Sequence, residues 1–387
     1  MNTKSLTSRE RLNAALNHIE PDRVPFDLGS TFTTGIHIQA YHQLRARLNM
    51  MKSTGNFMCL DEQIVEVEDD LVESLGVDTR PITPGNPQGY ALEIEDHGDY
   101  YHFINEWGMG LKMPKDGGLY YDVYLHPLKE TFSISDLVAY AWPDPTDPAR
   151  YIGLTSNAHS LASSGKGIVL NSMCAGIMEI AGWLLGYERL FTALAQEKPF
   201  MEYLLDRITE IKLAYWERAL AEVGENVDVV QEADDLGAQF HPLISPKMYR
   251  ALLKPRHKRL FDFIHSRTQA KLFLHSCGAI RPLLPDLIDA GVQIINPVQV
   301  SAAGMETAEL KRDFGKDLVF WGGGVDTQRI LGSGSPEEVR QETRKRIEDL
   351  APGGGFVFST VHNVQSNVPA ENLIAMWETL QTYGIYI

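Results

Sequence analysis

Short, strongly apolar runs recur along the second half of this chain, and they limit its fold more than any other feature. Six of them follow one another from residue 167: GIVLNS (167–172), VDVVQEA (227–233), AKLFLHS (270–276), VQIINP (292–297), DLVFWG (317–322) and GFVFST (355–360). Helical patterns separate several of these runs, as in residues 198–223. Continuous apolar strands that alternate with helices indicate a parallel sheet that is covered on both faces or closed into a barrel.

The polar residues that end these runs favour the closed barrel. VPFDL (24–28) supplies a further strand, which brings the number close to the roughly eight strands of a (β/α)8 barrel. Side chains suited to chemistry follow the runs: Asp27, Asn171, Glu232, Asp234, Asp235, His275, Cys277, Asn296, Gln299, Asp326, His362 and Asn363. A (β/α)8 barrel builds its site from the carboxyl ends of several strands, whereas a doubly wound sheet uses one switch point. The sequence therefore predicts a (β/α)8 TIM barrel.

The chain is expected to form a single barrel domain over residues 1–387 with two additions. Thr7-x-x-Glu10 matches a capping box and opens an amino-terminal helix that precedes the first strand. Residues 85–128 alternate or cluster β-forming residues between Gly, Asp and Pro, which predicts an antiparallel β insertion or lid.

Composition excludes several classes of partner. The net charge of −16 disfavours binding to nucleic acid and to anionic membranes. The most apolar segment is interrupted by Glu179 and is too short to span a bilayer, and the first residues do not resemble a secretory signal. Three cysteines cannot form a disulfide framework, so a cytoplasmic protein is expected. A homodimer is one assembly that the sequence leaves open.

His275 and Cys277 stand two positions apart at the end of an apolar strand, where both could bind zinc. A His or Cys at a strand end is more often structural, and only the convergence of other polar strand ends makes a metal site credible. Catalytic zinc takes three protein ligands. Four residues remain open as the third ligand: Cys59, Cys174, His362 and Glu232. The two cysteines are poorly placed for this role, whereas His362 and Glu232 each stand at a strand end.

Two further motifs have a functional and a structural interpretation. QEADDLG (231–237) supplies a metal ligand or a general acid or base, or else a solvated turn and a helix cap. WGGGVDTQ (321–328) could cradle a phosphate, but it lacks a Walker pattern, and a tight turn with close backbone approach is favoured.

Several motifs together resemble the uroporphyrinogen decarboxylase superfamily: RERLNAALNHIEPDRVPFDLG, WPDP, QEADDLG, LFLHSCG, GVQIINPVQ, FWGGGVDTQ and NVPAEN. The resemblance covers most of the chain, is weakest in residues 50–125, and implies a (β/α)8 barrel. True decarboxylases of the superfamily carry an Arg-rich segment near the first strand, whereas LGSTFTTGIHIQAY (28–41) contains no arginine. Porphyrinogen decarboxylation is therefore not expected, because a polyanionic tetrapyrrole needs fixed cations.

The other branch of the superfamily consists of zinc methyltransferases that work with corrinoid proteins. In this branch His-x-Cys is followed late in the barrel by a third ligand, a cysteine, and this position falls at or beside His362 here. The resemblance implies Zn²⁺ and a cobalamin carried by a separate corrinoid protein, because no Asp-x-His-x-x-Gly motif occurs in this chain. The substrate expected is a small methyl donor or acceptor, either a methoxylated compound or a thiol, and the histidine in place of cysteine favours the methoxylated donor.

The resemblance and the strand ends together assign roles. The expected metal ligands are His275, Cys277 and His362, with Glu232 as a fourth or alternative ligand. Residues expected to move a proton or orient substrate are Glu232, Asp234, Asp235 and Gln299. Substrate contacts are expected from Asp27, Asn171, Asn296, Asp326 and Asn363. Two alternatives stay open: a metal-independent, decarboxylase-like lyase acting on a carboxylated substrate, and a non-catalytic protein that binds a corrinoid or tetrapyrrole.

Overall fold

A curled parallel sheet forms the centre of the computed structural model, which describes residues 6–53 and 55–386. Its strand order is β13-β12-β11-β10-β9-β8-β3. In chain order the strands are β3 (Thr79–Ile82), β8 (Gly167–Leu170), β9 (Val229–Ala233), β10 (Lys271–His275), β11 (Ile294–Asn296), β12 (Val319–Trp321) and β13 (Phe356–Val357). Each strand pairs in parallel with the next one along the chain, and six of the seven match the predicted apolar runs.

Residues 24–28 close this sheet into a barrel by taking the place between β13 and β3. Phe26 forms a parallel bridge with Phe358, and the Asp27 amide donates to the Phe358 carbonyl at 2.9 Å. On the other side the Asp78 amide donates to the Phe26 carbonyl at 2.7 Å. The predicted (β/α)8 barrel is thus confirmed. The strand that sequence patterns did not reveal is β3, whose sequence TRPI contains an arginine and a proline.

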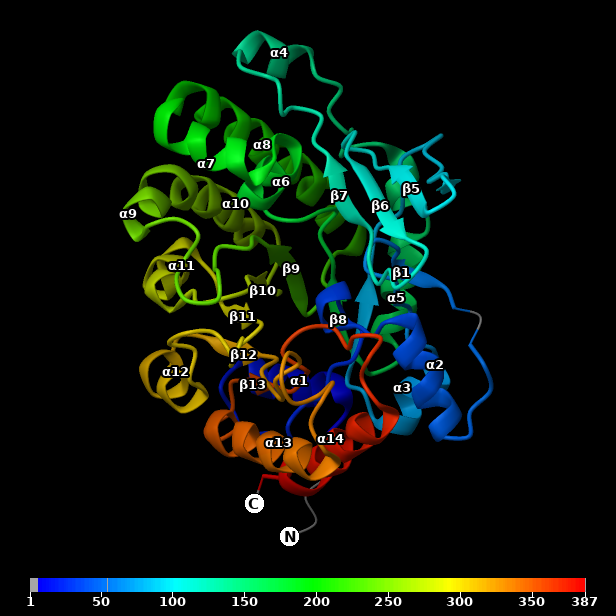
Figure 1. Ribbon diagram of the computed structural model, residues 1–387. Coiled ribbons are helices and arrows are strands. Elements are labelled where there is room, and N and C mark those ends of the chain that lie inside the picture. The colour runs from blue at the N-terminus through cyan, green and yellow to red at the C-terminus, as the bar shows by residue number, and fades with distance from the viewer. Residues whose placement is uncertain (1–5, 54, 387) are drawn as a thin grey trace.

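Helices surround the strands on the outside of the barrel, as Figure 1 shows. Those after β8 are α6 (Ile177–Leu185), α7 (Tyr187–Gln196), α8 (Lys198–Val223), α9 (Pro246–Met248), α10 (Lys254–Arg267), α11 (Leu284–Ala290), α12 (Thr307–Phe314), α13 (Pro336–Leu350) and α14 (Ala370–Tyr383). A π-helical turn over Tyr249–Leu253 precedes Pro255, which lies at the start of α10. The reason is that proline has no amide hydrogen for the helical ladder.

The amino-terminal helix α1 (Ser8–Leu16) packs against the end of the barrel where the strands begin. Its predicted capping box between Thr7 and Glu10 is present. Leu12 and Leu16 join a buried cluster with inward-facing strand residues: Val169, Val229, Phe273, Ile294, Val319, Trp321 and Val357. A Cβ on Gly167, the first residue of β8, would lie 2.2 Å from Cδ2 of Leu12, so a larger residue there would force the Leu12 side chain to move. This cluster makes the interior of the barrel apolar at that end.

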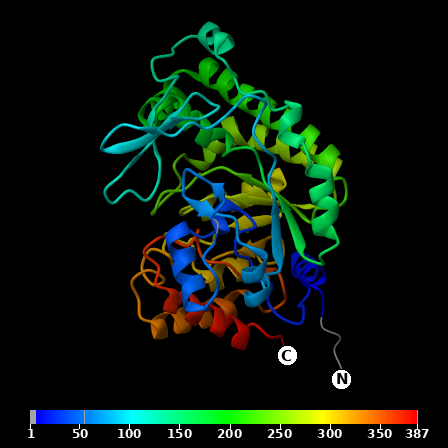
Figure 2. The same ribbon diagram turned by 90° about the vertical axis from the view of Figure 1, so that its right-hand side faces the viewer.

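An antiparallel sheet is inserted between β3 and β8, where a β-rich segment was predicted. Its strands, in the order β4-β5-β6-β7, are β4 (Glu95–Asp96), β5 (Tyr100–Ile104), β6 (Gly110–Pro114) and β7 (Asp122–Leu125). This inserted sheet extends away from the barrel in Figure 2. No helix in residues 6–53 or 55–386 combines the length and the apolar character needed to cross a bilayer.

Candidate metal centre

Three potential metal ligands meet at the carboxyl end of the barrel, and we call them the rim centre: His275, Cys277 and His362. His275 is the last residue of β10, Cys277 follows it, and His362 lies in the loop after β13. One ligand atom of each residue lies within 4.8 Å of those of the other two. The rings of His275 and His362 are 5.3 Å apart and steeply inclined at 75°.

The geometry of the pair His275 and Cys277 fits a zinc ion. Nε2 of His275 lies 3.4 Å from Sγ of Cys277. Two ligands at usual zinc–nitrogen and zinc–sulfur distances in a tetrahedron stand about 3.5 Å apart. An N₂S donor set with room for a further ligand is typical of catalytic rather than structural zinc.

Asn296, the last residue of β11, fixes which nitrogen of His275 faces the other ligands. Its Nδ2 donates to the Trp321 carbonyl at 2.9 Å, so its Oδ1 is the atom left to accept. This Oδ1 lies 2.6 Å from Nδ1 of His275, which therefore carries the proton. The lone pair of His275 is then on Nε2, where a metal would bind. Burial lowers the pKa of His275 to about 4, so its ring is neutral at ordinary pH.

Asp27 supports the position of Asn296 indirectly, through hydrogen bonds to Trp321. The Trp321 indole donates to Oδ2 of Asp27 at 2.8 Å, and the Thr79 hydroxyl donates to its Oδ1 at 2.6 Å. Burial raises the pKa of Asp27, although these hydrogen bonds partly offset it. Asp27 was expected to contact substrate directly. In the structure it is instead connected to the rim centre through Trp321 and Asn296.

Asp235 and Gln299 hold the loop that carries Cys277. The Cys277 amide donates to Oδ1 of Asp235 at 2.8 Å, and the Gly278 amide donates to Oε1 of Gln299 at 2.7 Å. Oδ1 of Asp235 also lies 3.7 Å from Nε2 of His275. Asp235 is half-buried beside the ligands, so it is placed to bind the ion or to move a proton.

Two carboxylates that the sequence patterns did not single out also surround the rim centre. The pKa of the Cys277 thiol is raised well above its usual range, chiefly by burial and further by the nearby Asp235, Glu179 and Glu62. Burial raises the pKa of Glu62, whereas the nearby His362 lowers it. Burial, followed by the nearby Asp235, Asp234 and Glu62, raises the pKa of Glu179, on α6, well above its usual range. A lone glutamate inside the apolar segment of α6 was a signal for Glu179, but Glu62 follows no recognisable strand.

Glu232 does not join the rim centre, which corrects its prediction as a ligand and as a catalytic group. It pairs in register with Leu274, whereas Ala233 pairs with His275. Because neighbouring side chains of a strand point to opposite faces, Glu232 faces the outer helices. There Oε2 of Glu232 lies 2.9 Å from Nζ of Lys212, and the Trp216 indole donates to its Oε1 at 2.5 Å.

Two cysteines considered as third ligands also lie outside the rim centre. Cys174 has its Sγ 3.8 Å from Nζ of Lys212, on the outer side of the barrel. Burial raises the pKa of Cys174 to about 12. Cys59 belongs to β1 (Phe57–Cys59), which pairs with β2 (Ile64–Val65) outside the barrel sheet.

Asp234 has a structural role, which corrects its prediction as a proton-transfer residue. It is fully buried and accepts the amides of Met178 and Glu179 at 3.1 and 3.0 Å, at the start of α6. Nε2 of His257 lies 2.9 Å from its Oδ2. The interpretation of QEADDLG as a helix cap therefore holds for Asp234, whereas its neighbour Asp235 faces the rim centre.

The glycine-rich segment after β12 forms a close-packed turn. Gly322 has a φ of +90°, and a Cβ on Gly324 would lie 2.5 Å from the ring of Phe358. Asp326 accepts the Gln328 amide at 2.8 Å and so caps the next turn. Asp326 was expected to contact substrate, and its carboxylate is instead used within this loop.

The two remaining asparagines predicted as substrate contacts are both buried. Asn171 donates from Nδ2 to the Ser30 carbonyl and the Thr83 hydroxyl, both at 3.1 Å, and its Oδ1 has no hydrogen-bond partner. Asn363 donates to Oε2 of Glu62 and accepts from Gln365. Asn363 thus connects Glu62 to the loop of His362.

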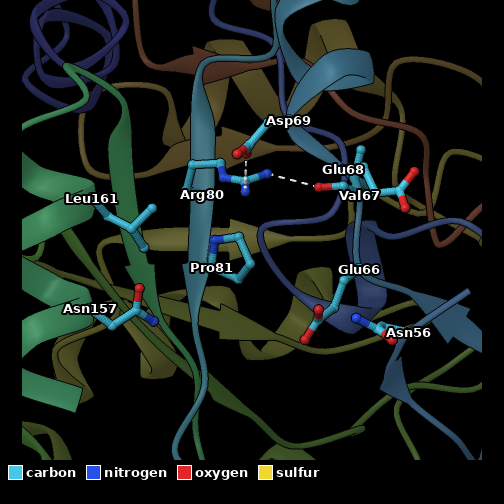
Figure 3. A pocket seen from close by; sticks show the side chains of 9 residues that line it. All are labelled: Asn56, Glu66, Val67, Glu68, Asp69, Arg80, Pro81, Asn157 and Leu161. Carbon is cyan, nitrogen blue, oxygen red and sulfur yellow. Dashed lines mark hydrogen bonds and ion pairs between the residues drawn. The ribbon is translucent and has the colours of Figure 1, made fainter. Parts of the chain in front are cut away.

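A cavity of about 450 Å³ lies elsewhere, on the outside of the barrel (Figure 3). Its lining shares no residue with the rim centre: Asn56, Glu66, Val67, Glu68, Asp69, Arg80, Pro81, Asn157 and Leu161. The Arg80 guanidinium in it is already bonded to Asp69 at 2.5 Å and to the Val67 carbonyl at 2.8 Å. This cavity therefore has no direct part in chemistry at the rim.

Comparison with known proteins finds relatives that are methyltransferases and uroporphyrinogen decarboxylases. A methylcobamide:CoM methyltransferase, MtaA, of Methanosarcina barkeri is 26% identical over 202 residues, covering 51% of this chain and 56% of the relative. The chain thus spans about half the length of this relative. A uroporphyrinogen decarboxylase of Alkalilimnicola ehrlichii is 23% identical over 388 residues, covering 96% and 93% of the two chains.

A solved structure shares the whole fold. A methyltransferase from Methanosarcina mazei superposes with a TM-score of 0.64 at 19% identity, covering 98% of this chain and 99% of that one. The family model described as uroporphyrinogen decarboxylase (URO-D) matches residues 102–383, from the inserted sheet to the end of α14. The chain therefore belongs to the uroporphyrinogen decarboxylase family.

Proposed function

We propose that this protein is a zinc-dependent methyltransferase that moves a methyl group between a small substrate and a corrinoid bound to a separate protein. The observation that carries the proposal is the convergence of His275, Cys277 and His362 within 4.8 Å at the carboxyl end of the barrel. The names of the relatives support methyl transfer and decarboxylation alike, and the donor set favours methyl transfer because it suits zinc.

The residues around the rim centre have separable tasks in this proposal. When bound, zinc would supply a Lewis acid for an ether or hydroxyl oxygen, or hold a thiol as its thiolate. His275, Cys277 and His362 would hold the ion, with Asn296 fixing the tautomer of His275. Asp235 holds the Cys277 loop through the amide at 2.8 Å, and its carboxylate is placed to take or give a proton.

The charges at the rim bear on the substrate. Two ionisable neighbours, Asp235 and His362, shift the pKa of His275. The same two residues also shift the pKa of Glu62. In the described part of the chain no Lys or Arg is among the causes of these pKa shifts, and the carboxylates repel a polyanion such as a porphyrinogen. A neutral methoxylated compound therefore suits this site best, with a small thiol as the second choice.

Direct assay of methyl transfer tests this proposal. Zinc-loaded protein is mixed with reduced cobalamin and a panel of methoxylated compounds, or with methylcobalamin and thiols, and the cobalamin spectrum is followed. We expect methyl transfer in at least one mixture and none with Cys277→Ala. The matched control is Cys59→Ala, because Cys59 is a half-buried cysteine outside the rim centre.

Two results would contradict the proposal. One is purified protein that neither contains zinc nor binds it stoichiometrically. The other is release of carbon dioxide from a carboxylated substrate, without methyl transfer, by wild-type protein and Cys277→Ala alike. The second result would establish a metal-independent lyase instead.

A further inference from the structure

A second group of metal-binding side chains lies on the inserted sheet, far along the chain from the rim residues. Glu95, His97 and His102 each offer a ligand atom, and these atoms lie within 4.8 Å of one another. Glu95 and His102 are register partners on β4 and β5. A tight turn at Gly98, where φ is +80°, joins the two strands and returns the chain beside His97. We call this group the hairpin centre.

The distances within the hairpin centre suit a tetrahedral ion. Nε2 of His97 lies 2.8 Å from Oε2 of Glu95, and Nδ1 of His102 lies 3.7 Å from the same oxygen. Nitrogen and oxygen ligands of a tetrahedral zinc ion stand about 3.3 Å apart. The two measured distances fall on either side of this value, so small side-chain rotations would bring all three donors onto one ion.

His102 provides an independent reason to expect a ligand. The residue is only 8% exposed, and neither of its ring nitrogens has a hydrogen-bond partner. Buried polar side-chain atoms are nearly always bonded, so an unbonded imidazole next to a carboxylate and a second imidazole calls for an explanation. A metal ion bound at Nδ1 would supply the missing partner.

The neighbouring charges are compatible with a bound cation. Lys112 is the register partner of His102 on β6, but its Nζ lies over the rings of Tyr100 and Tyr124, 5.6 and 4.9 Å from their centroids. These rings hold the ammonium group through cation–π contacts. Glu95 is then the charged group in direct reach of both histidines.

We propose that Glu95, His97 and His102 form a second site for a divalent transition metal of the zinc, nickel or copper class. Two imidazoles and a carboxylate are ligands that these ions accept, and they would leave a fourth position for water. An ion bound there would tie β4 to β5 and order the tip of the inserted sheet. The site is independent of the proposed methyl transfer, because it shares no residue with the rim centre.

Zinc stoichiometry tests the second site. Metal-free protein is dialysed against zinc at concentrations close to that of the protein, and bound metal is counted by elemental analysis. We expect two zinc ions in wild type, one in His97→Ala, one in Cys277→Ala and none in the double variant. His159→Ala is the matched control, because His159 is an exposed histidine on α5 (Leu154–Ala162), and it should bind two.

Cobalt binding assigns each ion to its site. Only the rim centre contains a thiol, so Cys277→Ala should lose the thiolate-to-cobalt charge-transfer band while His97→Ala keeps it. The His97 side chain is 42% exposed, so its replacement should leave the fold intact, which circular dichroism checks. The proposal is overturned if a folded His97→Ala binds as much zinc as wild type, or if the second ion binds only at a large excess of metal.

Hydrogen exchange gives a second readout. Zinc should slow amide exchange in residues 95–104 of Cys277→Ala, whose rim centre is disabled, and should not do so when His97→Ala is added. Equal exchange with and without zinc in Cys277→Ala would also overturn the proposal.

Discussion

The rim centre and the hairpin centre are built in opposite ways. The rim residues come from two segments far apart in the chain, the end of β10 and the loop after β13, and Asn296 and Asp235 hold the first of these in place. The hairpin ligands come from one short stretch, and the Glu95 and His97 side chains remain 59% and 42% exposed. Rigid elements and outer hydrogen bonds preorganise a site, whereas a local group on a surface hairpin is adjustable. We therefore expect tight, chemically tuned binding at the rim and weaker binding at the hairpin.

The largest effect is expected from Cys277→Ala at the rim. Removing a ligand should weaken zinc binding there by at least about 100-fold, the upper end of what loss of an outer-shell partner costs. Competition with a chelator of known affinity measures this change. Cys174→Ala is a control on the outer side of the barrel and should leave zinc affinity unchanged. If Cys277→Ala binds zinc at the rim centre as tightly as wild type, the expected difference in zinc affinity between the rim centre and the hairpin centre is wrong.

Glu232→Gln should affect stability and leave the metal in place. The variant leaves the buried ammonium of Lys212 without its carboxylate, which costs roughly 3–5 kcal/mol of unfolding free energy. Urea unfolding measures the loss, and elemental analysis measures zinc. Glu210→Gln, on the exposed side of α8, is the control and should be near neutral. Loss of zinc from a stable Glu232→Gln would restore Glu232 as a ligand.

Asn296→Ala tests the preorganisation that separates the two centres. Without the acceptor at 2.6 Å from Nδ1 of His275, the ring loses its fixed tautomer, and zinc affinity should fall by about 10- to 100-fold. Asn296→Asp keeps an acceptor and should recover most of the affinity, which a purely structural role would not explain. Equal affinities in both variants would contradict the role assigned to Asn296.

Proton release on metal binding is the smallest of the expected differences. Burial and nearby carboxylates raise the pKa of the Cys277 thiol, so the metal-free thiol is protonated at neutral pH, whereas His275 with a pKa of about 4 is already neutral. Zinc binding at the rim should therefore release about one proton, and the site should weaken as pH falls. Calorimetry in buffers of different ionisation enthalpy counts the proton. Cys277→Ala should release none, and an unchanged proton count in that variant would contradict this assignment.

Local patterns predicted the barrel well because apolar runs and caps are short-range signals. The strand that they missed, β3, is short and carries Arg80 and Pro81 within TRPI. Its place in the sheet comes from pairing with β8, which is a tertiary effect. The inserted β-rich segment was predicted because alternation and turn residues are equally local.

The candidate site was predicted less completely, because the face on which a side chain lies depends on strand register. Within QEADDLG, Glu232 and Asp234 face the outer helices, and Asp235 alone lies beside the rim ligands. Sequence shows three carboxylates but not which of them points inward. Glu62 reaches the rim from a segment without a strand pattern, so only the folded chain reveals it.

The closure of the barrel by residues 24–28 has a consequence for the order in which the molecule is assembled. Phe26 can pair with Phe358 only after the intervening residues have been synthesised, and His362 comes four residues after Phe358. A nascent chain that contains His275 and Cys277 but ends before β13 thus has neither a closed barrel nor His362. We therefore expect the rim centre to form late in the folding of the barrel, and shortened translation products that end before β13 to lack both barrel closure and His362.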